Sequence, residues 1–392
     1  MTKEKAKEPQ IRFKGFTNAW EQRKLGEVGS VSMCRRIFKE QTSENGDIPF
    51  YKIGTFGGEA DAFISREVFE EYRAKYPYPK KGDILLSASG SIGRIVEFTG
   101  KNEYFQDSNI VWLNHDERLD NSFLKCFYSI VKWAGIEGST IKRLYNNNIL
   151  NTVINLPIVE EQQKIGAYFA NLDHLITLHQ RKCDLLSKAK KTLLQKMFPK
   201  NGKTTPEIRF KGFTGAWEQR KLSQMCQITM GQSPDGTTYS DTPSDYILVQ
   251  GNADLKDGWV CPRIWTTQKT KTADAGDLIM SVRAPAGAMG KTAYNVVLGR
   301  GVAGIKGNEF VYQILVKMDS EGHWKKLAAG STFESINSDT VCNAEIIVPQ
   351  DVEEQKAIGE YFKCLDTLIT LHQHELEKLQ NIKKSCLKMM FV

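Results

Sequence analysis

The sequence predicts an α+β protein with a pseudo-two-fold internal repeat. Two similar domains of mixed α/β structure are expected, joined by two long antiparallel coiled-coil helices. Three observations predict this fold: two segments recur almost unchanged in each half of the 392-residue chain, a long Pro-free heptad pattern accompanies the second of them, and the sequences in between diverge and contain short strand-like runs.

The recurring segments divide the chain. Residues 9–25 (PQIRFKGFTNAWEQRKL) return as residues 206–222 (PEIRFKGFTGAWEQRKL), with 15 of 17 positions identical. Residues 160–180 return in a similar form as residues 353–373. Because the sequences between them differ, we expect constant segments around two variable domains. The expected parts are an N-terminal segment 1–25, a first variable domain 26–157, a central long helix 158–198, a linker with the repeated segment 199–222, a second variable domain 223–349 and a C-terminal long helix 350–392.

The two constant stretches that follow the variable domains are predicted helices. Seam residues recur in steps of four and three along both copies, the heptad spacing of a coiled coil, except for one step of seven where Lys190 and Lys383 take the seam position. They are Ile165, Phe169, Leu172, Ile176, His179, Cys183, Leu186, Leu193 and Met197, and then Ile358, Phe362, Leu365, Ile369, His372, Leu376, Leu379, Cys386 and Met390. Each helix is expected to have about 39 residues and to span roughly 58 Å at 1.5 Å per residue. We expect His179 and His372 to be seam residues without a metal or catalytic role.

The variable domains contain short apolar runs bounded by Gly, Asn and Asp, which are typical of strands. Examples are residues 84–86 and 110–113 in the first domain and 246–249 and 278–280 in the second. Helices are expected at 119–134 and 308–320.

Several loops of both domains combine Gly with Ser, Asn and Arg. Arg binds guanine bidentately, Asn and Gln bind adenine, and Ser serves base or phosphate, so these loops suit a DNA groove. Each loop taken alone also fits ordinary turn chemistry, in which Gly and Asn supply positive φ. The candidate DNA-binding residues are Ser89, Ser91, Arg94, Lys142, Arg143, Tyr145, Asn146, Asn147, Gln232, Ser233, Arg283, Lys291, Arg300 and Asn337.

Composition sets broad limits on the class of protein. A net charge of +7 permits a polyanionic partner. The eight cysteines are scattered, with no C-x-x-C pair, which argues against structural zinc and for free thiols in a cytoplasmic protein. The sequence shows neither a signal peptide nor an apolar run of membrane-spanning length.

The sequence carries none of the catalytic motifs that we tested. It lacks an Asn/Asp-Pro-Pro-aromatic methyltransferase motif, H-E-x-x-H and G-x-S-x-G. Gly287-Ala-Met-Gly-Lys-Thr292 resembles the end of a phosphate-binding loop, but Pro285 stands where the first glycine is required. We therefore expect a binding protein without catalytic residues, metal or cofactor of its own.

The chain resembles the specificity subunits of type I restriction–modification systems. The resemblance rests on the repeated Phe-Lys-Gly-Phe…Trp…Lys-Leu segment, the Glu-Gln-Gln-Lys-Ile-Gly helix start and the Leu-Ile-Thr-Leu-His-Gln stretch, and it covers nearly the whole chain. The second variable domain, with Gly231-Gln-Ser-Pro234 and Gly299-Arg-Gly301, also resembles the target-recognition domains of that family.

The resemblance implies a function for each part. Each variable domain would be a target-recognition domain that reads one half of an asymmetric, bipartite double-stranded DNA target. The paired helices would space the half-sites and bind two methyltransferase subunits, with restriction subunits joining outside. S-adenosylmethionine, ATP and Mg²⁺ would belong to these partners. Two other classes stay open at this stage: a stand-alone DNA-modifying enzyme and a coiled-coil scaffold that binds only proteins.

Overall fold

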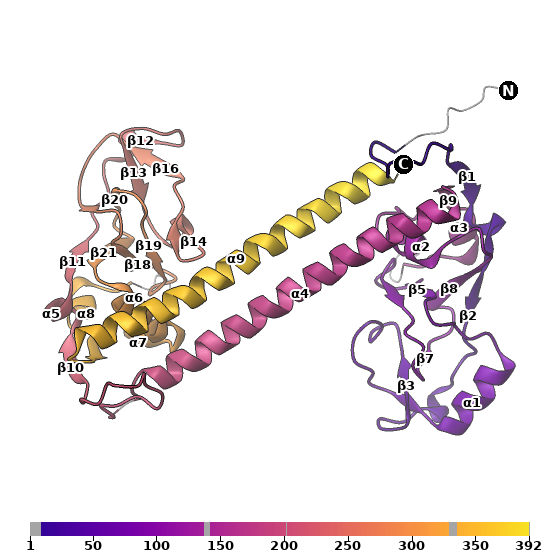
Figure 1. The fold of residues 1–392 in the computed structure, drawn as a ribbon, viewed down its shortest axis with the longest axis horizontal. Coiled ribbons are helices and arrows are strands. Elements are labelled where there is room, and N and C mark those ends of the chain that lie inside the picture. The colour runs from indigo at the N-terminus through magenta and orange to yellow at the C-terminus, as the bar shows by residue number, and fades with distance from the viewer. Residues whose placement is uncertain (1–8, 137–141, 201, 329–334, 392) are drawn as a thin grey trace. The chain divides into compact units, whose positions relative to one another are not determined.

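The structure is a computed structural model that describes residues 9–136, 142–200, 202–328 and 335–391. It divides into two compact units. Unit 1 comprises Met1–Leu178 and Leu376–Val392, and unit 2 comprises His179–Glu375. Each unit contains one strand-rich domain and one half of each long helix (Figure 1). Within the described ranges, no helix has the length and apolar character needed to cross a membrane.

Unit 1 has mixed helix and sheet content, as predicted. One sheet has the order β2-β8-β5-β6 and is antiparallel throughout, and a smaller sheet has the order β4-β3-β7. The strands are β1 Glu21–Lys24, β2 Gly29–Met33, β3 Ile48–Tyr51, β4 Phe63–Ile64, β5 Ile84–Ser87, β6 Ile95–Glu97, β7 Tyr104–Phe105, β8 Ile110–His115 and β9 Val153–Leu156. The short helices are α1 Arg66–Lys75, α2 Asn121–Tyr128 and α3 Asn146–Leu150.

Unit 2 repeats this plan with more strands. Its sheets have the orders β11-β21-β18-β19-β15-β14 and β12-β16-β13-β20-β17. The strands are β10 Glu218–Lys221, β11 Gln227–Met230, β12 Tyr239–Ser240, β13 Tyr246–Val249, β14 Leu255–Lys256, β15 Trp259–Val260, β16 Ile264–Thr266, β17 Thr272–Ala273, β18 Leu278–Ser281, β19 Met289–Lys291, β20 Val296–Leu298, β21 Val302–Lys306 and β22 Glu345–Val348. The short helices are α5 Leu222–Met225, α6 Glu309–Ser320, α7 His323–Leu327 and α8 Ser338–Cys342.

The two expected long helices are α4 Val159–Met197 and α9 Val352–Met390, each of 39 residues. The seam predicted from the heptad spacing is buried or half-buried along both helices. Of the two shorter helices that we predicted, α6 agrees closely with 308–320. Helix α2 is shorter than 119–134: it begins after Asp120, which caps it, and ends before Ser129, whose hydroxyl donates to Cys126 O.

The long helices are antiparallel and are joined by the same ion pair in both units. In unit 1, Lys383 Nζ lies 2.5 Å from Asp173 Oδ1. In unit 2, Lys190 Nζ lies 2.5 Å from Asp366 Oδ1. Lys190 and Asp173 are the equivalents of Lys383 and Asp366 in the repeat, so the two copies exchange roles. This internal equivalence confirms the predicted pseudo-two-fold repeat.

The His pair confirms the seam position predicted for both residues. His179 Nδ1 and His372 Nδ1 lie 3.2 Å apart, and their rings meet edge to face in unit 2. His179 and His372 occupy equivalent positions of the repeat, so the same side chain of each helix lies at the contact between the two helices.

The repeated aromatic segments pack against the long helices and do not form separate parts. In unit 1, Trp20 is 5% exposed and contacts Phe123 and Phe391. In unit 2, Trp217 makes the equivalent contacts with Phe198 and Phe310. Apolar burial of this kind contributes roughly 25 cal/mol per Å². The near-identity of these segments therefore reflects a shared packing role.

Buried ion pairs fix the same segments to the start of each long helix. Arg12 contacts Glu161 in unit 1 at 2.7 Å, and Arg209 contacts Glu354 in unit 2 at 2.6 Å. Both carboxylates are almost fully buried, at 0% and 1% exposure. A buried charge requires such a partner.

The strand that ends each repeated segment pairs with the strand that leaves the variable domain. Strand β1 is antiparallel to β9, and β10 is antiparallel to β22. The backbone N–H of Leu25 donates to Thr152 O at 3.0 Å, and that of Leu222 donates to Ala344 O at 2.8 Å. The chain therefore enters and leaves each variable domain at one place.

Candidate nucleic-acid interface

In unit 1, four loops meet at one end of the β2-β8-β5-β6 sheet, and we call them the first loop end. They comprise residues 34–38, 88–94, 107–109 and 142–145. Backbone bonds join three of them: Ala88 N–H donates to Asn109 O at 2.7 Å, and Leu144 N–H donates to Ala88 O at 2.8 Å. Ser89 and Arg143 form an isolated β-bridge. Residues far apart in the sequence are thus held in one surface.

Most of the predicted residues of unit 1 are exposed at or next to this loop end. They are Ser91, Arg94, Lys142, Arg143, Tyr145, Asn146 and Asn147, with the two asparagines opening helix α3. Arg94 Nη1 donates to Phe56 O at 2.7 Å, which fixes the direction of that guanidinium. Ser89 differs, because it is 4% exposed and its hydroxyl donates to Asn109 Oδ1 at 2.7 Å. Its position assigns it to holding two loops together and not to the surface.

Unit 2 has an equivalent arrangement, the second loop end. It comprises residues 231–234, 282–287, 299–301 and 335–337. Val282 N–H donates to Gly301 O at 2.8 Å, and Ile336 N–H donates to Val282 O at 2.9 Å. These bonds match those of Ala88 and Leu144 in unit 1 one for one. The two variable domains therefore share a framework although their loop sequences differ.

Close backbone contacts explain the glycines of this second loop end. A Cβ on Gly231 would lie 2.0 Å from Gly299 O, and a Cβ on Gly301 would lie 2.0 Å from Gln250 O. No side chain fits in such a space. The Gly-Gln-Ser-Pro and Gly-Arg-Gly motifs thus place Gln232, Ser233 and Arg300 at the surface by letting their neighbours pack backbone against backbone.

The structure brings five of the six predicted residues of unit 2 to this loop end. Gln232, Arg283 and Arg300 are exposed. The Ser233 hydroxyl accepts from the Arg300 backbone N–H at 3.1 Å and from Arg300 Nε at 3.4 Å. Asn337 caps helix α8, with its Oδ1 accepting from Thr340 N–H at 2.8 Å.

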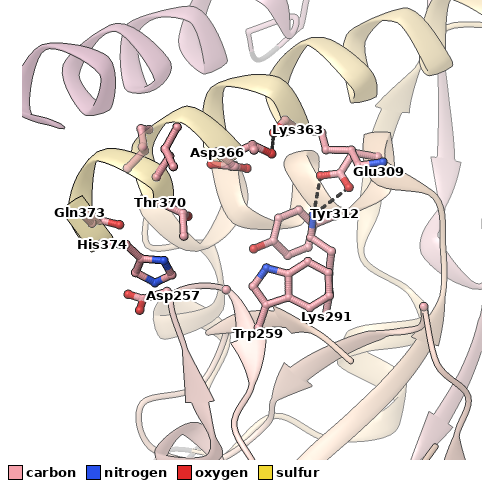
Figure 2. Close-up of a pocket in the computed structure, with 15 residues that line it drawn as sticks. Asp257, Trp259, Lys291, Glu309, Tyr312, Lys363, Asp366, Thr370, Gln373 and His374 are labelled. Atoms are coloured by element: carbon pink, nitrogen blue, oxygen red, sulfur yellow. Dashed lines mark hydrogen bonds and ion pairs between the residues drawn. The ribbon is translucent and has the colours of Figure 1, made fainter. Parts of the chain in front are cut away.

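Lys291, the sixth candidate DNA-binding residue of unit 2, lies apart from these residues and outside the second loop end. It ends strand β19, where pairing with β18 and β15 turns it toward helix α6. Figure 2 shows its ammonium beside Tyr312 and Trp259 with dashed lines to the Glu309 carboxylate, whose oxygens lie 2.7 and 2.9 Å away. The ring centroids lie 4.2 and 5.6 Å from Nζ. A cation that already has a carboxylate and two aromatic faces is held within the protein.

Lys291 lines a cleft of about 710 Å³ between the strand-rich domain of unit 2 and helix α9. Trp259, at 46% exposure, forms one wall, and Asp366, Thr370 and His374 of α9 form another (Figure 2). Within the described ranges, no three His, Cys, Asp or Glu side chains are arranged to hold a metal ion.

The first loop end also contains residues that sequence reasoning missed. Arg35 and Arg36 lie two and three residues after the end of strand β2, as Gln232 and Ser233 do after the end of β11. The strand registers make this match specific: Met33 pairs with Val111 and Met230 pairs with Ala303, at equivalent positions of β8 and β21. The available signal was an Arg-Arg pair one residue beyond the first strand of the variable domain, which the Gly-x-Ser-Pro pattern does not include.

Comparison with known proteins agrees with the repeated architecture. The family described as "Type I restriction modification DNA specificity domain" matches twice, at residues 18–188 and 215–381. A protein of Methanocaldococcus jannaschii named as the specificity subunit of the type I restriction enzyme MjaX is 27% identical over 95% of this chain and 92% of its own length. A Haemophilus influenzae protein named as a type I restriction enzyme specificity subunit is 61% identical over a shorter stretch, 36% of this chain and 37% of its own length.

Solved structures show the same fold. The S subunit of a type I restriction–modification system from M. genitalium has a TM-score of 0.71 at 14% identity, with 98% of this chain and 99% of that chain covered. A chain from a structure of a type I R-M system assembly has a TM-score of 0.53 at 21% identity, with 94% and 96% covered. With two matches that together span most of its length, the chain belongs to the family of type I restriction–modification DNA specificity subunits.

Proposed function

We propose that this chain selects the DNA target of a type I restriction–modification complex, with each variable domain reading one half of an asymmetric, bipartite site. The observation that carries the proposal is the combination of an equivalent framework with different loop ends. Equivalent backbone bonds support loops that carry Arg143 and Lys142 in unit 1 but Arg283 and Arg300 in unit 2. Two domains that are built alike but carry different polar groups are suited to two different base sequences.

The exposed groups of both loop ends suit contact with the major groove. Arginine binds guanine through two parallel N–H bonds, and amide side chains bind adenine in the same manner. Lys142 and Arg143 add positive charge that phosphates attract. We leave Ser89 and Lys291 out of the proposed interface because the bonds described above already engage both side chains, and Lys291 lies outside the second loop end.

The proposed division of labour assigns the chemistry to other subunits. Two methyltransferase subunits would bind the long helices α4 and α9, and restriction subunits would join outside them. These partner subunits would bind S-adenosylmethionine, ATP and Mg²⁺. This chain would supply no catalytic group. A direct test incubates the purified chain with DNA and either S-adenosylmethionine or Mg²⁺; methylation or cleavage without partners would contradict the proposal and favour a stand-alone enzyme.

The modular part of the proposal is tested by exchange of one domain. Residues 26–157 would be replaced by the matching domain of another member of the family, and methylated sites would be mapped in DNA from cells that also carry the methyltransferase partner. One half-site should change and the other should stay. A change in both half-sites would refute independent reading. Absence of any sequence-specific methylation with the unmodified chain would instead favour a protein-only scaffold.

The long helices are proposed to set the distance between the half-sites. Major-groove half-sites on one face of DNA lie about 34 Å apart, and a helix of 39 residues exceeds that length. Insertion of four residues between 181 and 196 should alter the gap that is tolerated between half-sites and leave their bases unchanged. An unchanged gap would mean that the helices do not act as a spacer.

A further inference from the structure

The first loop end contains an arginine whose free edge is oriented by a carboxylate. Arg36 Nε donates to Asp107 Oδ2 at 3.1 Å across two loops that are far apart in the sequence. The Arg36 side chain is 61% exposed, whereas that of Asp107 is 20% exposed. A guanidinium bonded through Nε keeps Nη1 and Nη2 as a pair of donors on its outer edge. Among the described residues, no bonded partner of these two nitrogens is found.

The second loop end also contains an arginine that bonds across two loops through Nε, but there the arginine and its acceptor lie on the opposite loops. There Arg300 belongs to the 299–301 loop, and its Nε donates to Ser233 Oγ on the 231–234 loop. Strand register makes Arg36 the equivalent of Ser233, and Ser108 the equivalent of Arg300. In both units, therefore, one arginine bonds through Nε between the same two loops, although it comes from opposite loops.

The surroundings of Arg36 include open space beside its side chain. A pocket of about 290 Å³ lies beside it and is lined by Met33, Cys34, Arg35, Arg36, Tyr76, Pro77 and Asp107. The Arg35 guanidinium lies over the Tyr76 ring, 5.2 Å from its centroid, so that wall is held in place by a cation–π contact.

From this geometry we infer that Arg36 reads a guanine in the half-site of the first domain, with Nη1 and Nη2 donating to O6 and N7 in the major groove and Asp107 fixing the guanidinium plane. Arg300 does the same for the second half-site. The inference rests on the proposed function and deepens it, because it names one determinant of base identity in each domain. Bidentate contact of arginine with guanine is the geometry that two parallel donors allow.

The test uses the whole complex and maps methylated sites in cells that carry this chain with its methyltransferase partner. Arg36→Ala should relax one G·C position in one half-site and lower the affinity of the purified complex for its target by about 5- to 150-fold. The second half-site should stay as in the unmodified chain, which also shows that the complex is folded. Arg36→Lys keeps the charge without the fork and should relax the same position.

The matched control is Arg118→Ala. Arg118 also bonds a neighbouring carboxylate, that of Asp116, and is 51% exposed, but it lies past the opposite end of strand β8. Its loss should leave both half-sites unchanged. Asp107→Ala should act on the same position as Arg36→Ala, since it releases the guanidinium.

Several results would overturn the inference. An unchanged motif with Arg36→Ala would do so, and so would full discrimination with Arg36→Lys. A uniform loss of affinity for all sequences, with the salt slope reduced by about one, would assign Arg36 to a phosphate instead. If the unmodified chain directed no sequence-specific methylation, the proposed function itself would fail. A bipartite motif that is insensitive to Arg36 would overturn only this inference.

Discussion

The buried ion pair between Arg209 and Glu354 provides a quantitative test of the framework of unit 2. Both carboxylate oxygens accept charge-assisted bonds, from Arg209 Nε at 2.6 Å and Nη2 at 2.7 Å. The Glu354 side chain is 1% exposed, so water does not replace a lost partner. At about 1.5–3 kcal/mol for each bond to a charged group, Arg209→Leu should lower the free energy of unfolding by about 3–6 kcal/mol. This agrees with the 3–5 kcal/mol expected for breaking a buried pair.

Urea denaturation measures the free energy of unfolding. Hydrogen exchange shows which backbone amides lose their protection from exchange with solvent. Peptides from the start of α9 and from residues 206–222 should lose protection, while those of unit 1 should keep it. The double variant Arg209→Leu/Glu354→Leu removes the stranded charge and should recover much of the loss. A loss below about 1 kcal/mol in the single variant, or a double variant as unstable as the single one, would refute the reasoning.

Three further predictions concern the helix seam and the loops. Lys190→Glu sets two carboxylates side by side at Asp366 and should destabilise unit 2 by at least about 1 kcal/mol, with recovery in the Lys190→Glu/Asp366→Lys exchange, measured in a double-mutant cycle. Burial, together with the nearby Lys182 and His179, lowers the pKa of His372 in the folded chain. The unfolded chain therefore binds more protons than the folded chain as the pH falls through about 6.5, and the helix seam should be less stable at pH 5.5 than at pH 7.5. Urea denaturation at each pH measures this dependence, which should diminish in His372→Gln. Gly301→Ala should relax recognition of the second half-site only, because its Cβ would lie 2.0 Å from Gln250 O, and methylation mapping checks this; an unchanged motif would show that the loop adjusts.

The fold was predictable wherever local pattern determines structure. The Pro-free stretch after Pro157 and the heptad spacing up to Met197 placed the long helix to within about a residue at each end. The repeat itself indicated that the second helix would match the first. The extent of helix α2 was less predictable, since its end depends on Ser129 bonding back to Cys126 O.

The sequence indicated which loops carry the candidate residues, but it did not indicate the contacts that those residues make. Ser89 and Lys291 stand in Gly-rich stretches that resemble exposed loops, yet strand pairing buries one and turns the other toward Glu309. Arg36 was missed because the variable domains have diverged too far for sequence to align it with Ser233. Only the register of β2 on β8 and of β11 on β21 makes that match. Such pairing is non-local and leaves no local pattern.

The paired strands at the base of each variable domain have a consequence for how these proteins change. Strand β1 pairs with β9, and β10 pairs with β22, so the chain enters and leaves each variable domain on two hydrogen-bonded strands. A whole domain is therefore an insertion between these two neighbouring strands, which act as its anchors. A domain of another length or sheet content can occupy the same anchors if it keeps the contacts that bind it to the long helices, such as the bond from Gln313 Nε2 to Asp366 Oδ2 at 2.8 Å. Unit 2 already illustrates this tolerance, since its sheets carry strands such as β14 and β15 that extend the plan of unit 1. New specificities can thus arise by replacement of a whole domain that keeps these anchors and contacts.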